Sequence, residues 1–110
     1  MYKEIKLYTQ DGEKTFGFLA TGSTAIRYRQ VFHQDLMVLL NKLQKIDETD
    51  DVDTGIVDKL AFIMNAQAEK RDMNTLNVDA FLEWADQFDG AELFLHMQEF
   101  VTLYLGSRRT

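Results

Sequence analysis

The stretch from Thr21 to Ile46 constrains the fold of this 110-residue chain more than any other. Large apolar side chains recur in it at steps of three and four residues, which places them on one side of an α-helix. These side chains are Tyr28, Phe32, Leu36, Leu39, Leu43 and Ile46. Hydroxyls at Thr21, Ser23 and Thr24 can accept a backbone N–H bond at the start of such a helix. The spacing therefore predicts one long amphipathic helix, from about Thr24 to Ile46, at the centre of the fold.

This helix carries more apolar surface than a single core face requires. Further apolar side chains extend around both flanks of the stripe: Ile26, Val31, Met37, Val38 and Leu40. Either other helices cover both flanks, or one flank contacts a partner or a second copy of the chain. Arg27 and Arg29, on either side of the stripe, could orient a helical client by their charge. The residues that we predict to contact a partner are Ile26, Arg27, Arg29, Met37, Leu40 and Trp84.

A β-hairpin is predicted before this helix. Residues 2–8 and 14–19 alternate apolar and polar side chains, and the dipeptide Asp11-Gly12 between them suits a tight turn. A two-stranded hairpin is marginal alone, so its apolar face should rest on the long helix. The apolar residues of that face are Ile5, Leu7, Phe16 and Phe18.

Three more helices are predicted after it, over about 56–71, 78–88 and 91–106. Asn77 is a cap for the helix over 78–88, and Asp89 with Glu92 resembles a capping box for the helix over 91–106. The predicted inward faces include Ile56, Leu60, Ile63 and Met64, then Val78, Phe81, Leu82, Ala85 and Phe88, then Phe94, Met97, Val101 and Tyr104, whereas Phe62 and Trp84 lie off their stripes. The predicted fold class is α+β, mainly α: an N-terminal β-hairpin packed beside about four helices. One domain spans 1–110, with a hairpin at 1–20, helices at 21–106 and a frayed tail at 107–110.

Composition limits the cellular compartment and the classes of partner that we expect for this chain. The chain has no proline and no cysteine, which favours helices and a reducing cytoplasm and excludes disulfides and thiol chemistry. No signal peptide and no run of about 18 apolar residues is present, so we expect neither secretion nor a membrane span. The net charge of −6 argues against binding to nucleic acid.

Neither the acidic run at 47–53 nor the histidines match a metal site. With Gly55 at the sixth position of a calcium loop, the twelfth position would be Ala61, where a bidentate Glu is required. A solvated linker that ends in a helix cap explains the acidic run better. His33 and His96 lack a second ligand at the spacing of a known metal motif, so we interpret both as surface or boundary residues.

Catalytic motifs are missing as well. The chain contains no G-x-S-x-G nucleophile elbow, no G-x-G-x-x-G and no phosphate-binding G-x-x-x-x-G-K-[ST] loop. The 18 acidic residues always allow some carboxylate pair, but nothing selects one for acid-base chemistry. We therefore expect a protein that is not an enzyme and needs no cofactor.

A resemblance to a known family enters at the first helix. The pattern F-x-A-T-x-x-T-x-x-R-Y-R-x-x-F-x-x-D-L is formed by Phe18, Ala20, Thr21, Thr24, Arg27, Tyr28, Arg29, Phe32, Asp35 and Leu36. A shorter match follows at Phe81, Leu82, Glu83 and Trp84. The pattern, and the order of hairpin, helix and helical pair, resembles the tail assembly chaperones of long non-contractile-tailed bacteriophages and prophages of Gram-positive hosts.

The resemblance implies a non-enzymatic role. Such chaperones bind the tape-measure protein, keep this long helical chain soluble, help to gather tail-tube subunits on it, and leave before the virion is mature. The chain ends in GSRRT without an appended domain, which looks like the short form, so a longer frameshift form of itself is a further expected partner. Self-association in the bacterial cytoplasm is expected too.

An acidic inhibitor or regulatory adaptor that binds a basic surface of a partner is the alternative. A client held through apolar patches stays bound in high salt, whereas binding led by charge weakens.

Overall fold

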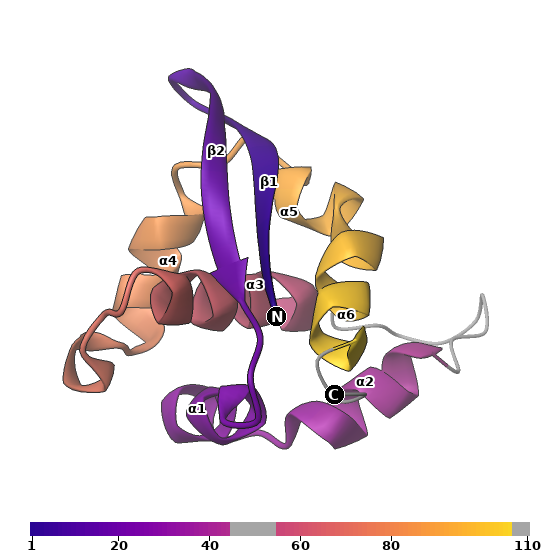
Figure 1. Cartoon of the computed structure of the whole chain (residues 1–110). Coiled ribbons are helices and arrows are strands. Elements are labelled where there is room, and N and C mark those ends of the chain that lie inside the picture. Colours follow the sequence, from indigo (N-terminus) through magenta and orange to yellow (C-terminus); the bar gives the residue numbers. More distant parts are fainter. Residues whose placement is uncertain (45–54, 107–110) are drawn as a thin grey trace.

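The computed structural model describes residues 1–44 and 55–106. A hairpin of β1 (Tyr2–Thr9) and β2 (Gly12–Leu19) precedes α1 (Thr24–Phe32), α2 (Leu36–Gln44), α3 (Gly55–Ala68), a short 3-10 helix (Met73–Thr75), α4 (Val78–Ala85), α5 (Glu92–Leu95) and α6 (Met97–Gly106). The fold is α+β and mainly helical, with the antiparallel hairpin packed against the helices, as predicted (Figure 1). The acidic run with its calcium alternative, and the tail at 107–110, lie outside the described residues.

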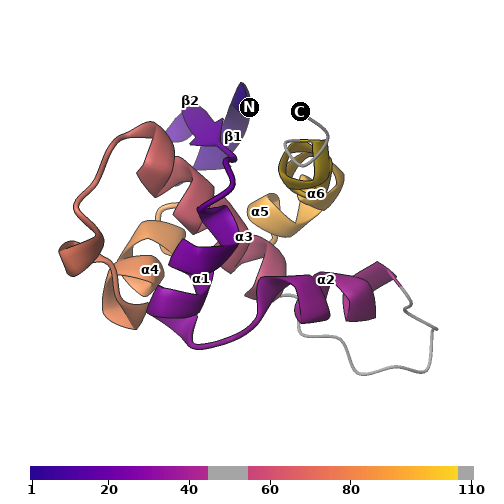
Figure 2. The ribbon, with the colours of Figure 1, turned by 60° about the horizontal axis from the view of Figure 1, so that its bottom comes forward.

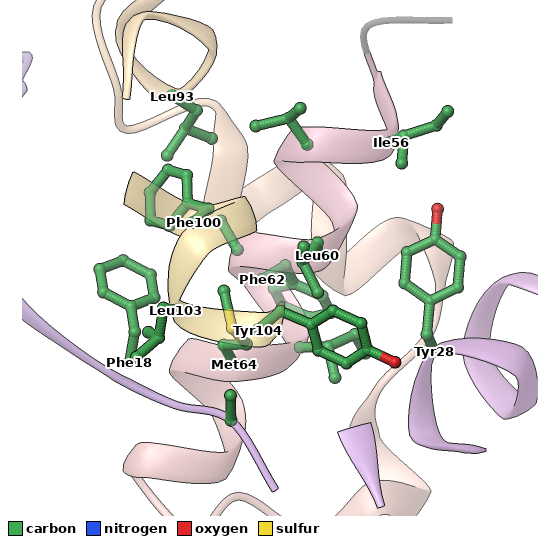
Figure 3. Packing of buried hydrophobic residues seen from close by; sticks show 14 of the residues in the cluster. Phe18, Tyr28, Ile56, Leu60, Phe62, Met64, Leu93, Phe100, Leu103 and Tyr104 are labelled. Atoms are coloured by element: carbon green, nitrogen blue, oxygen red, sulfur yellow. The ribbon is translucent and has the colours of Figure 1, made fainter. Parts of the chain in front are cut away.

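α3 lies at the centre of the fold, where the sequence placed the first helix. It contacts β2 and the helices α1, α2, α4, α5 and α6. Figure 3 shows it between Phe100 and Leu103 of α6 on one side and Tyr28 of α1 on the other. Every residue from Leu60 to Ala66 is buried, and none of them is charged. A helix that is apolar all round can be covered on every side, which is also why Phe62, predicted to lie off the stripe, is fully buried.

The predicted long helix is two helices with an elbow at residues 33–35 (Figure 2). His33 takes a left-handed conformation with φ of 58°, and its N–H donates to the Arg29 carbonyl at 2.8 Å, which ends α1. The Asp35 carboxylate then accepts from the N–H groups of Met37 and Val38, at 3.0 and 3.4 Å. These bonds satisfy amides that would otherwise lack partners at the start of α2. The apolar spacing continues across the elbow, so periodicity alone concealed it.

The hairpin rests on α3 and is also tied to the segment after α4. The turn forms at Gln10 and Asp11, and Gly12 takes a φ of 105° that a side chain would disfavour. The Gln10 N–H donates to the Gln87 carbonyl at 2.8 Å, and the Asp89 N–H donates to the Tyr8 carbonyl at 3.2 Å. The long helix is therefore not the main support of the hairpin, contrary to the prediction.

The predicted cap of α4 is confirmed, whereas the predicted buried face of α4 and the predicted final helix with its capping box need correction. The Asn77 side chain caps α4 by accepting from the Ala80 N–H at 2.8 Å, as expected. However, α4 buries Phe81 and Trp84, and leaves Val78 and Leu82 half-exposed. The final helix is broken into α5 and α6, and Asp89 and Glu92 form no capping box. Instead the Glu92 carboxylate accepts from the Tyr8 N–H of β1 at 2.7 Å.

Within the two described ranges, no helix has both the length and the apolar character needed to cross a bilayer.

Candidate partner-binding surface

Two of the six predicted partner-contacting residues belong to the core. Leu40 is only 1% exposed and Trp84 only 6% exposed. The Trp84 ring packs against Phe62 and Phe88, with centroids 5.5 and 4.8 Å away, and its Nε1–H donates to Asn65 Oδ1 at 3.0 Å. Their assignment to a partner surface was wrong, because α3 offers a covering neighbour that the sequence pattern did not reveal.

Met37 occupies an intermediate position. Its side chain is half-buried and packs against the core. The Tyr104 hydroxyl of α6 donates to its sulfur at 3.4 Å. A thioether is an adaptable packing group, and here it joins α2 to α6. Met37 therefore does not offer a free surface, and a charge placed there would disturb the fold before it disturbed a partner.

Two other predicted partner-contacting residues, Ile26 and Arg29, lie together at the elbow between α1 and α2. They line an open pocket of about 150 Å³, which we call the elbow pocket; its lining residues are Ala25, Ile26, Arg29, Asp35 and Leu36. Ile26 is 60% exposed, although a large aliphatic side chain is more stable when covered. Val38 is also exposed on the first turn of α2, where its N–H meets the Asp35 carboxylate.

The elbow pocket combines apolar and charged side chains. Ile26 and Ala25 offer apolar area, while Arg29 and Asp35 supply one charge of each sign. Such a mixture favours a helix that inserts an apolar side chain and is oriented by its own charges.

Arg27 lies on the other side of α1. Two residues correspond to about 200° around a helix, so Arg27 and Arg29 point nearly opposite ways. The Arg27 Nε–H donates to Ser23 Oγ at 3.0 Å. Arg27 lines a second, larger pocket beside the end of α3. The two arginines thus lie on opposite sides of α1, each beside a different pocket.

The histidines also differ from each other. His33 is exposed at the end of α1. His96 is half-buried, with Nε2 3.4 Å from Glu92 and Nδ1 3.3 Å from Glu99. The Glu92 carboxylate also accepts from the Tyr8 N–H of β1. Glu92, His96 and Glu99 together therefore fasten α5 and α6 to the hairpin. Among the residues described, no group of three or more His, Cys, Asp or Glu side chains is placed to hold a metal ion.

Comparison of the chain with protein-family models, curated proteins and solved structures finds no significant match. The described surface offers the elbow pocket on one side of α1 and the second pocket on the other. Three residues of the second pocket were not anticipated from the sequence: Gln67 at the end of α3, and Lys70 and Arg71 directly after it. They meet Arg27 only through the packing of α3 against α1.

Proposed function

We propose that the chain is a non-enzymatic tail assembly chaperone that binds a tape-measure protein through the elbow pocket. The observation that carries the proposal is the exposed Ile26, set between Arg29 and Asp35 in a pocket on the segment that bears the family resemblance.

The resembling residues divide into two groups. The buried members build the core around α1 and its entry: Phe18, Ala20, Thr24, Tyr28, Phe32 and Leu36. The charged members Arg27, Arg29 and Asp35 are at least partly exposed. Thr21, the remaining member, is uncharged and half-buried. A partner can reach the three charged side chains, so they are the part of the pattern that supports a binding role rather than a folding role.

A tape-measure protein suits this surface because it is itself a long helical chain. A client helix laid across the elbow would cover Ile26 with its apolar side chains and place its polar residues near Arg29 and Asp35. Apolar contacts near the centre of such an interface supply most of the affinity, whereas charges at its rim set orientation and association rate.

The proposal includes the other roles that the resemblance implies. The chaperone acts in the cytoplasm of the bacterial host, recruits tail-tube subunits to the tape-measure protein, associates with a longer frameshift form of itself, and leaves before the virion is complete. Its net charge of −6 would help to keep a complex with an apolar client in solution.

Co-expression with the tape-measure protein tests the proposal. We expect the client to be largely insoluble alone, and soluble and co-purifying when this chain is present. A client that stays equally insoluble with and without the chain would contradict the proposal.

Salt separates this function from that of an acidic inhibitor. Raising salt from about 0.1 to 1 M shortens the Debye length from about 10 to 3 Å, which screens charge-led contacts and leaves apolar ones. We expect co-purification to persist at 1 M salt; release of the client would favour the inhibitor.

A further inference from the structure

A pocket of about 380 Å³ lies where β2 leads into α1, beside the C-terminal end of α3. We call it the basic pocket; its lining residues are Leu19, Thr21, Ser23, Arg27, Gln67, Lys70 and Arg71. Three of these seven side chains are basic, and no acidic side chain lines the pocket among the residues described. This concentration of positive charge stands out in a chain whose net charge is −6.

Hydrogen bonds hold the wall of the basic pocket in one arrangement. Thr24 Oγ1, buried beneath the pocket, donates to Gln67 Oε1 at 2.7 Å, and Gln67 Nε2 donates to Thr21 Oγ1 at 3.0 Å. Thr21 Oγ1 lies 3.1 Å from Ser23 Oγ, which accepts from Arg27 Nε at 3.0 Å. The Arg27 guanidinium is therefore positioned before any ligand arrives, which lowers the entropic cost of binding one.

Positive charge is available in the pocket. The Arg71 guanidinium is partly neutralised, because Nη2 donates to Asn65 Oδ1 at 3.2 Å and pairs with Glu69. Within the described residues, neither the Lys70 ammonium nor the terminal nitrogens of Arg27 have a hydrogen bond or an ion pair. Two cationic groups are thus free to bind an anion there.

Lys70 occupies a backbone position that favours glycine. The Arg71 N–H donates to the Ala66 carbonyl and the Lys70 N–H to the Gln67 carbonyl, at 3.0 and 3.2 Å, which is the Schellman pattern of a helix end. Lys70 takes the left-handed φ that this motif requires, here 56°. A side chain there is strained relative to glycine. A lysine at this position is consistent with a role for its charge in the pocket.

We propose that the basic pocket binds the carboxylate of a Glu or Asp side chain presented by a protein partner. Arginine and hydroxyl groups donate readily to a carboxylate, and Leu19 offers an apolar wall for the methylene groups of such a side chain. A single carboxylate meets only local positive charge, whereas a polyanion such as nucleic acid would also be repelled by the net negative charge of the molecule. The inference is independent of the client that occupies the elbow pocket.

Titration of the nitrogen-15-labelled protein with N-acetyl-glutamate N-methylamide at millimolar concentrations and constant ionic strength tests this site by NMR. We expect saturable shifts at residues 21–23 and 67–71, and none with the glutamine analogue, which is isosteric but neutral. Equal shifts from the glutamine analogue would overturn the proposal. Inorganic phosphate that saturates the same signals at a lower concentration would overturn the carboxylate assignment.

Three variants locate the site. Arg27→Gln and Lys70→Gly should each weaken binding of the glutamate analogue at least threefold, while Lys70→Gly raises Tm by a few degrees because glycine relieves the left-handed strain. Arg29→Gln is the matched control: it removes the same charge from the same helix, but from the elbow pocket. Equal weakening by Arg29→Gln and Arg27→Gln would show a general charge effect and contradict a site in the basic pocket.

Discussion

Asn65 is the buried polar residue that joins the most parts of the fold. Its Nδ2 donates to the Gly17 carbonyl of β2 at 2.9 Å. Its Oδ1 accepts from Trp84 Nε1 of α4 at 3.0 Å and from Arg71 Nη2 at 3.2 Å. The Asn65 side chain is fully buried in α3, so its own polar atoms depend on these partners and have no access to solvent. The one amide therefore fixes the positions of the hairpin and α4 relative to α3.

Replacing Asn65 should destabilise the fold strongly. Asn65→Leu leaves the Gly17 carbonyl, the Trp84 indole N–H and the Arg71 guanidinium without this partner, and we expect a loss of about 2–4 kcal/mol in the free energy of unfolding. Urea denaturation followed by the fluorescence of Trp84, the only tryptophan, measures it. Asn74→Leu, at an exposed position, is the control and should change stability by less than about 0.5 kcal/mol. Similar losses in both variants would contradict the role of Asn65.

Residue-scale predictions succeeded where one face alone decides burial. Alternation in β1 correctly placed Ile5 and Leu7 inside. The same reasoning failed for Phe62 and Trp84, because it assumed a single buried face for helices that have neighbours on several sides. The partners of Asn65 could not be predicted at all, since they come from segments far apart in the chain.

At the scale of elements, the elbow between α1 and α2 is the feature that shapes the candidate site. It bends the apolar stripe so that Leu36 and Leu40 enter the core while Ile26 stays outside. An unbroken helix from Thr24 onward would have no pocket between its own residues. The sequence contains one signal for the elbow, the cap residue Asp35 directly before an apolar run, but the helical spacing of apolar residues continues across it.

The elbow leads to a prediction about Asp35. Asp35→Ala removes the acceptor for the first amides of α2, and we expect a loss of about 1 kcal/mol in the free energy of unfolding. Amide hydrogen exchange at Met37 and Val38 should become faster. Asp35→Asn keeps an oxygen acceptor and should retain most of the stability. Unchanged exchange in Asp35→Ala would mean that the cap does not define the start of α2.

Other elements were predictable because their signals are local. The hairpin turn and the Asn77 cap depend on residues within a few positions of each other, and both are present. The predicted capping box does not form, because the Glu92 carboxylate binds the Tyr8 N–H of β1. The division of the last helix at His96 was not predicted either. Contacts with distant strands override local propensity in such places.

At the scale of the whole molecule, apolar side chains remain on the surface of several helices. Ile26, Val78, Leu82, Phe94 and Leu95 are all at least one-third exposed. Covering this area in an assembly is favourable. We therefore expect self-association, seen in sedimentation velocity as a species heavier than the monomer that grows with concentration. A single monomeric species up to high concentration would contradict this expectation, and it would leave client binding untouched.

The most direct test of the account concerns Ile26 in the elbow pocket. Ile26→Asp and Gln30→Asp place the same charge on exposed positions of α1, but only Ile26 lines the pocket. Fluorescence anisotropy with a labelled helical fragment of the tape-measure protein measures the Kd of each variant, and a melting curve verifies its fold. We predict that Ile26→Asp weakens binding about tenfold or more at unchanged Tm, and that Gln30→Asp weakens it less than about twofold. Equal affinities for the two variants would contradict binding through the elbow pocket.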